Sequence, residues 1–161
     1  MASIVIKPIF IRENQSIINN FLESLHVNEH RLFEKTAPWS EIGKNYMAHL
    51  MDMQENFDGL CLLTMVGNQP AGFIFGYLDE PDESRIEVYT GKELYISDGY
   101  VSPQFRRMGL YRAMNHHLEQ HYKELGIKRM SRFTLSNNTE MQRFLESENY
   151  AVTRLLYEKW I

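Results

Sequence analysis

The segment from Tyr100 to Tyr111 has the residue types of an anion-binding turn. It reads Tyr-Val-Ser-Pro-Gln-Phe-Arg-Arg-Met-Gly-Leu-Tyr, and the surrounding apolar pattern predicts that a strand ends and a helix begins there. The start of a helix presents unpaired backbone N–H groups and the positive end of the helix dipole, which together bind phosphate. Arg106 and Arg107 add positive charge, and Gly109 lets the backbone approach a ligand closely. The same residues also fit a basic surface turn with an ordinary glycine near a helix start.

The order of the helices and strands expected around this turn indicates an α/β fold, with a single mixed central β-sheet flanked by helices. Apolar stripes at three- and four-residue spacing indicate helices around residues 17–25, 42–53, 110–125 and 141–145. The turn composition at residues 67–70 indicates a hairpin between two of the strands. Strands are expected at residues 4–9, 59–66, 71–78, 93–101, 127–135 and 150–160. We expect one domain spanning residues 1–161.

Composition excludes several classes of function. The chain has 161 residues and a net charge of -4, so nothing in its overall charge favours nucleic acid. No apolar run approaches the roughly 18 residues of a membrane span, and the first residues lack the layout of a signal peptide. The single cysteine, Cys61, lies in an apolar stretch and is expected to be a buried structural thiol. These features predict a cytoplasmic location.

The spacing of four residues in the turn segment matches a known signature. Val101, Pro103, Arg106 and Gly109 follow the order Val-x-Pro-x-x-Arg-x-x-Gly, which resembles the coenzyme A motif of the GNAT N-acetyltransferase superfamily. The motif ends in a small residue at the position that Tyr111 occupies here. The resemblance implies a GNAT-like acyl-CoA N-acyltransferase fold, with acetyl-CoA as the cofactor.

A second, downstream motif also resembles this family. Its Asn, Ala, apolar and Phe positions correspond to Asn138, Met141, Phe144 and Tyr150. Leu145 stands where the family has a tyrosine that protonates the departing thiolate. Tyr111 and Tyr150 are the two tyrosines that we consider as substitutes for it.

The resemblance implies transfer of an acetyl group from acetyl-CoA to a primary amine of a small molecule or peptide, by direct attack. The alternative is a catalytically weak acyl-CoA-binding regulatory or sensor domain, and a third reading is an α/β domain whose turn binds another phosphate ligand such as a nucleotide. A homodimer is possible, and no metal is expected. The residues implied in cofactor binding are Gly99, Tyr100, Val101, Arg106, Arg107, Met108, Gly109, Leu110, Tyr111 and Asn138.

Two carboxylates are candidates for accepting the proton of the amine. Asp98 is the first, because members of the family often carry an acid near that point, and Glu93 is the second. Gly99, inside the same predicted strand, suggests a bulge that would free backbone groups for the cofactor. For Asn138, the alternative to cofactor binding is a role as a helix cap. For Asp98, the alternative to catalysis is a solvated or turn-capping carboxylate.

Overall fold

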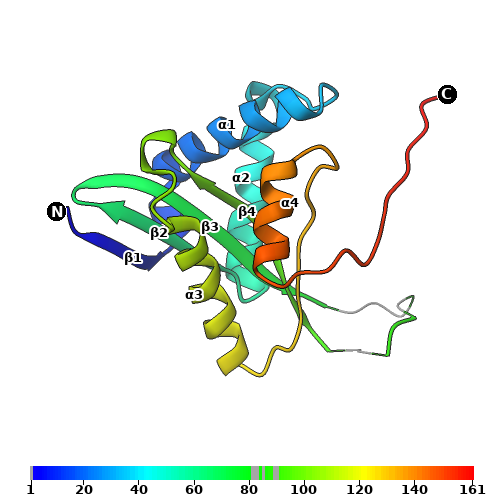
Figure 1. The fold of residues 1–161 in the computed structure, drawn as a ribbon. Helices are drawn as coiled ribbons and strands as arrows, with labels where there is room; N and C mark the ends of the chain where they lie inside the picture. The colour runs from blue at the N-terminus through cyan, green and yellow to red at the C-terminus, as the bar shows by residue number, and fades with distance from the viewer. Residues whose placement is uncertain (1, 81–83, 85, 89–90) are drawn as a thin grey trace.

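The structure is a computed structural model that describes residues 2–80, 84, 86–88 and 91–161 (Figure 1). It confirms the α/β fold, with a mixed sheet and helices on both faces. No helix in the described part of the chain is long and apolar enough to cross a membrane. The strands are β1 (Ile4–Ile9), β2 (Leu60–Val66), β3 (Gln69–Asp79), β4 (Glu93–Val101) and β5 (Met130–Ser131). The helices are α1 (Gln15–Leu32), α2 (Trp39–Asn56), α3 (Leu110–Glu124) and α4 (Thr139–Ser147), with short 3-10 turns at Ile11–Glu13 and Pro103–Phe105.

The five strands lie in the sheet in their sequence order, β1 to β5. The pairs β1–β2, β2–β3 and β3–β4 are antiparallel, and β2 and β3 form the expected hairpin. β5 is parallel to β4 and pairs with it only at Leu94↔Met130 and Tyr95↔Ser131. The C-terminal half of β4 therefore has no strand partner on its β5 side among the described residues.

Each face of the sheet carries its own apolar core. Successive side chains of a strand point to opposite faces, so Phe73 and Phe75 pack against α1 and α2, whereas Ile74 packs against α3. Ile18 and Leu22 of α1 are fully buried in the first core. The second core contains Leu110, Met114, Leu118 and Tyr122, the buried stripe of α3. β4 therefore lies between the α1 and α2 layer on one face and α3 on the other.

A one-residue bulge in β4 decides which side chains face which layer. Phe75 pairs with Asp98 and the next residue, Gly76, pairs with Ile96, so Ser97 is the extra residue. Before the bulge, Ile96 faces the α3 core; after it, Tyr100 faces the α1 and α2 core. A bulge reverses the alternation of side chains along a strand. The expected bulge therefore exists, but at Ser97 rather than at Gly99.

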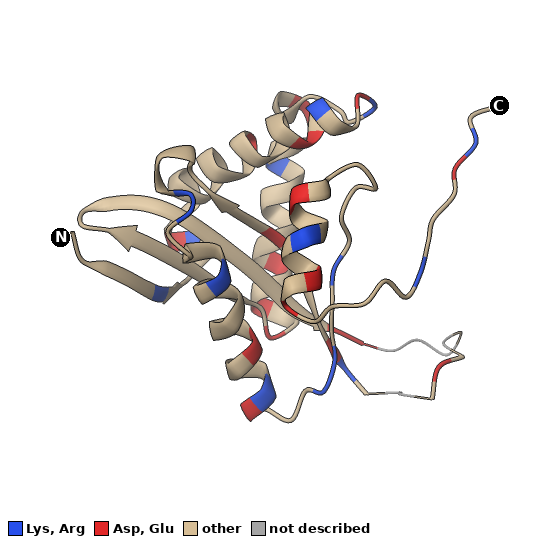
Figure 2. Cartoon of the chain, viewed as in Figure 1, with Lys and Arg blue, Asp and Glu red and all other residues tan. Residues whose placement is uncertain are grey.

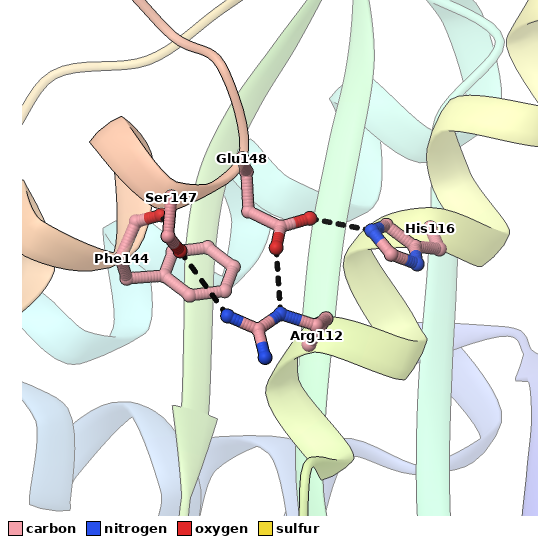
Figure 3. A network of polar contacts seen from close by, with 5 residues as sticks. All are labelled: Arg112, His116, Phe144, Ser147 and Glu148. Carbon is pink, nitrogen blue, oxygen red and sulfur yellow. Dashed lines mark hydrogen bonds and ion pairs between the residues drawn. The ribbon is translucent and has the colours of Figure 1, made fainter.

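α4 is fastened to α3 by a polar network (Figure 3). Arg112 Nε donates to Glu148 Oε1 at 2.6 Å, and Arg112 Nη2 donates to Ser147 Oγ at 3.1 Å. The other carboxylate oxygen of Glu148 contacts His116 Nε2. Burial acts to raise the pKa of Glu148, but the bonds from Arg112 and His116 outweigh it and lower that pKa. The network fixes the chain just before residues 150–161.

Two predicted strands differ from the structure. The strand expected at residues 127–135 is limited to Met130–Ser131, and the one expected at residues 150–160 does not form. The backbone of residues 150–161 is instead an extended tail that leaves the body of the molecule after α4 (Figure 1). A strand needs a neighbour that accepts its backbone hydrogen bonds, and residues 150–161 form no strand pairing with any described residue.

Candidate active site

Asp98 lies at the centre of the site, buried beneath α2. The bulge at Ser97 turns its side chain toward the α1 and α2 layer, where the Tyr46 hydroxyl donates to both carboxylate oxygens at 2.9 and 3.1 Å. Only 5% of Asp98 is exposed. Burial raises the pKa of Asp98, although the hydrogen bond from Tyr46 opposes this shift. A buried carboxylate with a raised pKa is suited to accept and return a proton.

A small pocket between α1, α2 and β4 leads to this carboxylate. Its cavity volume is about 70 Å³, and its walls combine aromatic, apolar and acidic side chains. Glu29 lies at its rim, and its pKa is raised by partial desolvation and then by the charge of Asp98. The remaining lining residues are Leu22, Leu25, His26, Trp39, Ile42 and Tyr46. Two coupled carboxylates with aromatic walls favour a positively charged guest.

The predicted anion-binding turn has the expected geometry at the end of β4. Arg107 and Gly109 both have positive φ, 63° and 75°, and α3 begins immediately after Gly109. The first backbone N–H of this helix that bonds to a carbonyl is that of Ala113, to Gly109 O at 3.0 Å. No side chain caps the helix. The N–H groups of Leu110 to Arg112 are thus available to an anion, and basic residues precede them (Figure 2).

The Arg106 side chain folds back onto the end of β4. Its Nε donates to Val101 O at 3.1 Å, and its guanidinium lies 5.7 Å from the ring centroid of Tyr100. Both contacts place the Arg106 side chain along an open groove of about 610 Å³ between α1 and the end of β4. Tyr100, Pro103 and Arg31 also line that groove.

Gly99 and Tyr111 fit together on the opposite face of β4. A Cβ atom on Gly99 would lie 2.7 Å from Tyr111 Cε2 and 2.8 Å from its hydroxyl, so only glycine leaves room for this ring. The ring also packs edge-on against Phe144 at 5.1 Å, and Arg132 lies 5.6 Å from its centroid. Tyr111, which stands where the motif has a small residue, therefore packs beside β4. It does not block the turn.

Several buried polar groups meet where β4 and β5 separate. The Tyr111 hydroxyl, both polar atoms of Asn115, the Tyr150 hydroxyl and two guanidinium nitrogens of Arg132 make no hydrogen bond of good geometry. Burial raises the pKa of Tyr111, and it raises that of Tyr150 to about 12, while the charge of Arg132 opposes both shifts. Arg132 lies next to Tyr111, and Asn115 lies next to Tyr150, so these groups interact with one another, and a polar ligand in the gap would add hydrogen bonds to them.

The chain matches the acetyltransferase (GNAT) family over residues 23–149. The protein belongs to the GNAT acetyltransferase family. Proteins of this family use acyl-CoA, and the match covers α2, β4, the turn and α3, together with the C-terminal part of α1.

Known proteins agree with this assignment. A segment of 88 residues is 29% identical to thialysine N-epsilon-acetyltransferase of Caenorhabditis elegans, covering 55% of this chain and 51% of that protein. The matched segment thus spans about half the length of that relative. An acetyl transferase from Pyrococcus furiosus superposes with a TM-score of 0.77 at 17% identity, over 99% of this chain and 100% of that one. An acetyltransferase from Clostridium acetobutylicum, described with acetyl-CoA, superposes with a TM-score of 0.76 at 15% identity, over 98% and 96% of the two chains.

Not all residues predicted for this GNAT site come together. Glu93 begins β4, five residues before Asp98, and is paired there with Arg129 Nε at 2.6 Å. Asn138 caps α4, where its Oδ1 accepts from the Met141 N–H at 3.1 Å. Cys61 is fully buried, and burial raises the pKa of its thiol, as expected for a structural cysteine. Among the described residues, no group of three or more metal-ligating side chains occurs.

The sequence did not single out Glu29 or Arg132 as site residues. Both reach the site from other elements, α1 and the segment after β5. Tyr46 of α2 also belongs to the site, because its hydroxyl donates directly to Asp98. The spacing of His26 and Glu29, three apart on one helix face, is the one local signal that points to the pocket.

Proposed function

We propose that this protein transfers an acetyl group from acetyl-CoA to the nitrogen of a cationic primary amine. The observation that carries the proposal is the placement of Asp98: the bulge at Ser97 turns it into a pocket with a second carboxylate, while Gly99 faces Tyr111 of α3 on the other side of the same strand, just before the anion-binding turn. A thioester and an amine approaching from opposite sides would meet at this strand.

The residues present fit acetyl-CoA. The N–H groups at the start of α3, with Arg107, suit the pyrophosphate, because that turn offers donors and positive charge. The unpaired edge of β4 from Gly99 to Val101 offers backbone groups to an amide-bearing chain. Asn115 and Arg132 offer further polar contacts in the gap. Arg106, Met108, Leu110 and Tyr111 would shape this site, and Asn138 would remain mainly a helix cap.

Asp98 would act as the proton acceptor. When bound, acetyl-CoA supplies a thioester carbonyl that an amine can attack. A primary amine has a pKa near 10.4 and is mostly protonated at neutral pH, so it must lose a proton before it attacks. Glu29 and Asp98 would hold the cation, and Asp98 would take its first proton and leave a neutral amine. As that amine attacks, the nitrogen–carbon bond would form and the carbon–sulfur bond would break, and the loss of the second nitrogen proton would balance the proton that the departing sulfur receives.

The Tyr111 hydroxyl is our candidate for returning a proton to the sulfur. It lies against Gly99, on the strand that carries Asp98. A tyrosine hydroxyl has an ordinary pKa near 10 and is protonated at neutral pH, and burial raises the pKa of Tyr111 further, so this hydroxyl carries a proton. Tyr150 is the matched comparison, because its hydroxyl is also buried near Arg132 but belongs to the chain after α4. Tyr111→Phe is expected to lower kcat, and Tyr150→Phe is expected to lower it less.

The test is release of free CoA thiol from acetyl-CoA with a panel of primary amines that includes thialysine, the substrate in the name of the Caenorhabditis elegans relative. Asp98→Asn should lower kcat/KM for an accepted amine by about 10²–10⁴-fold. The control is Asp52→Asn, which changes an exposed carboxylate elsewhere on α2. Equal loss in both variants, or no loss in Asp98→Asn, would refute the role of Asp98.

Leu145 favours one alternative, a domain that binds acyl-CoA as a sensor without turnover. This residue cannot donate a proton from the place of the family tyrosine. Binding of acetyl-CoA without thiol release for any amine in the panel would support the sensor, and release that depends on Asp98 would exclude it.

A further inference from the structure

The pocket that leads to Asp98 is small. Its cavity volume is about 70 Å³, whereas a cavity of roughly 150 Å³ holds a molecule of benzene. By that proportion the pocket has room for about three non-hydrogen atoms, which correspond to an amine nitrogen and the carbons next to it. Since Asp98 is buried, an amine whose nitrogen reaches this carboxylate must place its first carbon atoms between the pocket walls.

Trp39 forms one of these walls and is held by contacts on several sides. Its Nε1 donates to Asn19 Oδ1 at 3.3 Å, and its ring lies 5.7 Å from that of His26 and 6.0 Å from that of Tyr46, measured between centroids. His26 is itself fixed, because its Nε2 donates to the carbonyl oxygen of Ala37 at 2.5 Å. The indole ring thus has neighbours from both α1 and α2 and has little room to move aside for a guest.

Gly43 allows the Trp39 ring to lie close against α2. A Cβ atom on Gly43 would lie 2.7 Å from Trp39 Cε2 and 2.8 Å from its Nε1, so any other residue would push the ring away. Gly43 is buried one turn after Trp39 in the same helix. Glycine weakens the middle of a helix relative to alanine, and the space that the ring needs explains its presence here. The pair therefore sets the width of the pocket.

We propose that Trp39 restricts the acceptor to primary amines whose carbon next to the nitrogen is unbranched. A branch at that carbon adds a non-hydrogen atom to a full pocket, where it would meet Trp39 or the apolar side chains of Leu25 and Ile42. A carboxylate in that place would also face the carboxyl groups of Glu29 and Asp98. The substrate class is thus a linear aminoalkyl group. This inference rests on the proposed function, because it takes the amine to reach Asp98 through this pocket.

Binding of two isomeric amines tests the pocket without any acyl transfer. The chain has two tryptophans, so Trp160→Leu, in the exposed tail, leaves Trp39 as the only indole whose fluorescence reports a guest. The probes are n-butylamine and 2-aminobutane, which have the same atoms and differ in the branch at the first carbon. We expect n-butylamine to bind at least about 10-fold more tightly. Equal affinities, or no binding of n-butylamine, would overturn the proposal.

Variants of the wall then assign the preference to Trp39. The readout is the ratio of kcat/KM for the two amines in the thiol-release assay, which does not depend on how much of a variant is folded. Trp39→Leu should lower the preference for n-butylamine about 10-fold, whereas Gly43→Ala pushes the ring toward α1 and should increase it. The matched control is Trp160→Leu, which makes the same change at an exposed residue and should leave the ratio unchanged.

The outcomes separate this inference from the proposed acetyl transfer. A preference that survives Trp39→Leu, or thiol release that is equally fast with both isomers in the wild type, would overturn the role of Trp39 and leave the transfer intact. Selective binding of n-butylamine without thiol release would support the pocket and count against the transfer alone.

Discussion

Removing the hydroxyl of Tyr46 tests whether Asp98 works as a base. Tyr46→Phe keeps the aromatic ring against Trp39 and deletes only the donor that contacts both oxygens of Asp98, at 2.9 and 3.1 Å. The hydrogen bond favours the ionised carboxylate, so its loss moves the pKa of Asp98 upward, in the direction that burial already drives it.

The size of the effect follows from the charge of the acceptor. A hydrogen bond to a charged group contributes about 1.5–3 kcal/mol, and about 1.4 kcal/mol is a factor of ten in an equilibrium constant. At pH values below the pKa of Asp98, the ionised fraction of this carboxylate should therefore be about 10- to 100-fold smaller in the variant than in the wild type. Thiol release measured against pH should therefore show kcat/KM reduced by this factor on the acidic side. At higher pH, Asp98 ionises in the variant as well, and the rate should approach that of the wild type.

The control is Tyr77→Phe, which deletes a half-buried hydroxyl that makes no hydrogen bond with Asp98. It should leave the pH profile unchanged. A loss in Tyr46→Phe that is the same at every pH would refute the reasoning, because it would mean that Tyr46 shapes the pocket without acting on the ionisation of Asp98.

Three further outcomes are expected. Gly99→Ala should lower the free energy of unfolding by about 1–3 kcal/mol, since its Cβ would meet the Tyr111 ring at 2.7 Å, and adding Tyr111→Leu should recover part of that loss in chemical denaturation. Asp98→Asn should unfold at the same or a higher temperature than wild type at pH 8. The raised pKa of Asp98 makes folding less favourable as pH rises above the unfolded value of about 3.9, so the difference should vanish near pH 3.5 in thermal scans. Cys61→Ala should keep kcat within about twofold in the thiol-release assay, because the direct transfer that we propose needs no covalent enzyme intermediate and the thiol is fully buried; a loss near 10²-fold would show that it takes part.

Local patterns predicted most of the fold. Gly126 and Asn149 have positive φ of 85° and 64° after their helices, a conformation that glycine and asparagine adopt most readily at a helix end. The strands predicted at residues 127–135 and 150–160 were too long or did not form. Apolar content shows that a segment is able to join a sheet, but a strand forms only where a neighbouring strand pairs with it.

The site was predictable only where its residues are neighbours in sequence. The turn from Arg106 to Tyr111 and the acid at Asp98 lie within one short segment, and the motif placed them together. The contact of Tyr46 with Asp98 joins residues 52 positions apart, and it depends on an extra residue at Ser97 that reverses the strand. No local pattern reveals the side to which a bulge turns a carboxylate.

The central claim is that the turn before α3 holds acyl-CoA, and thermal unfolding with ligand tests it most directly. Saturating acetyl-CoA at about 100 times its Kd should add roughly 2.7 kcal/mol to the free energy of unfolding and raise Tm by several degrees, whereas ATP at the same concentration should not. No rise with acetyl-CoA, or an equal rise with ATP, would contradict the account.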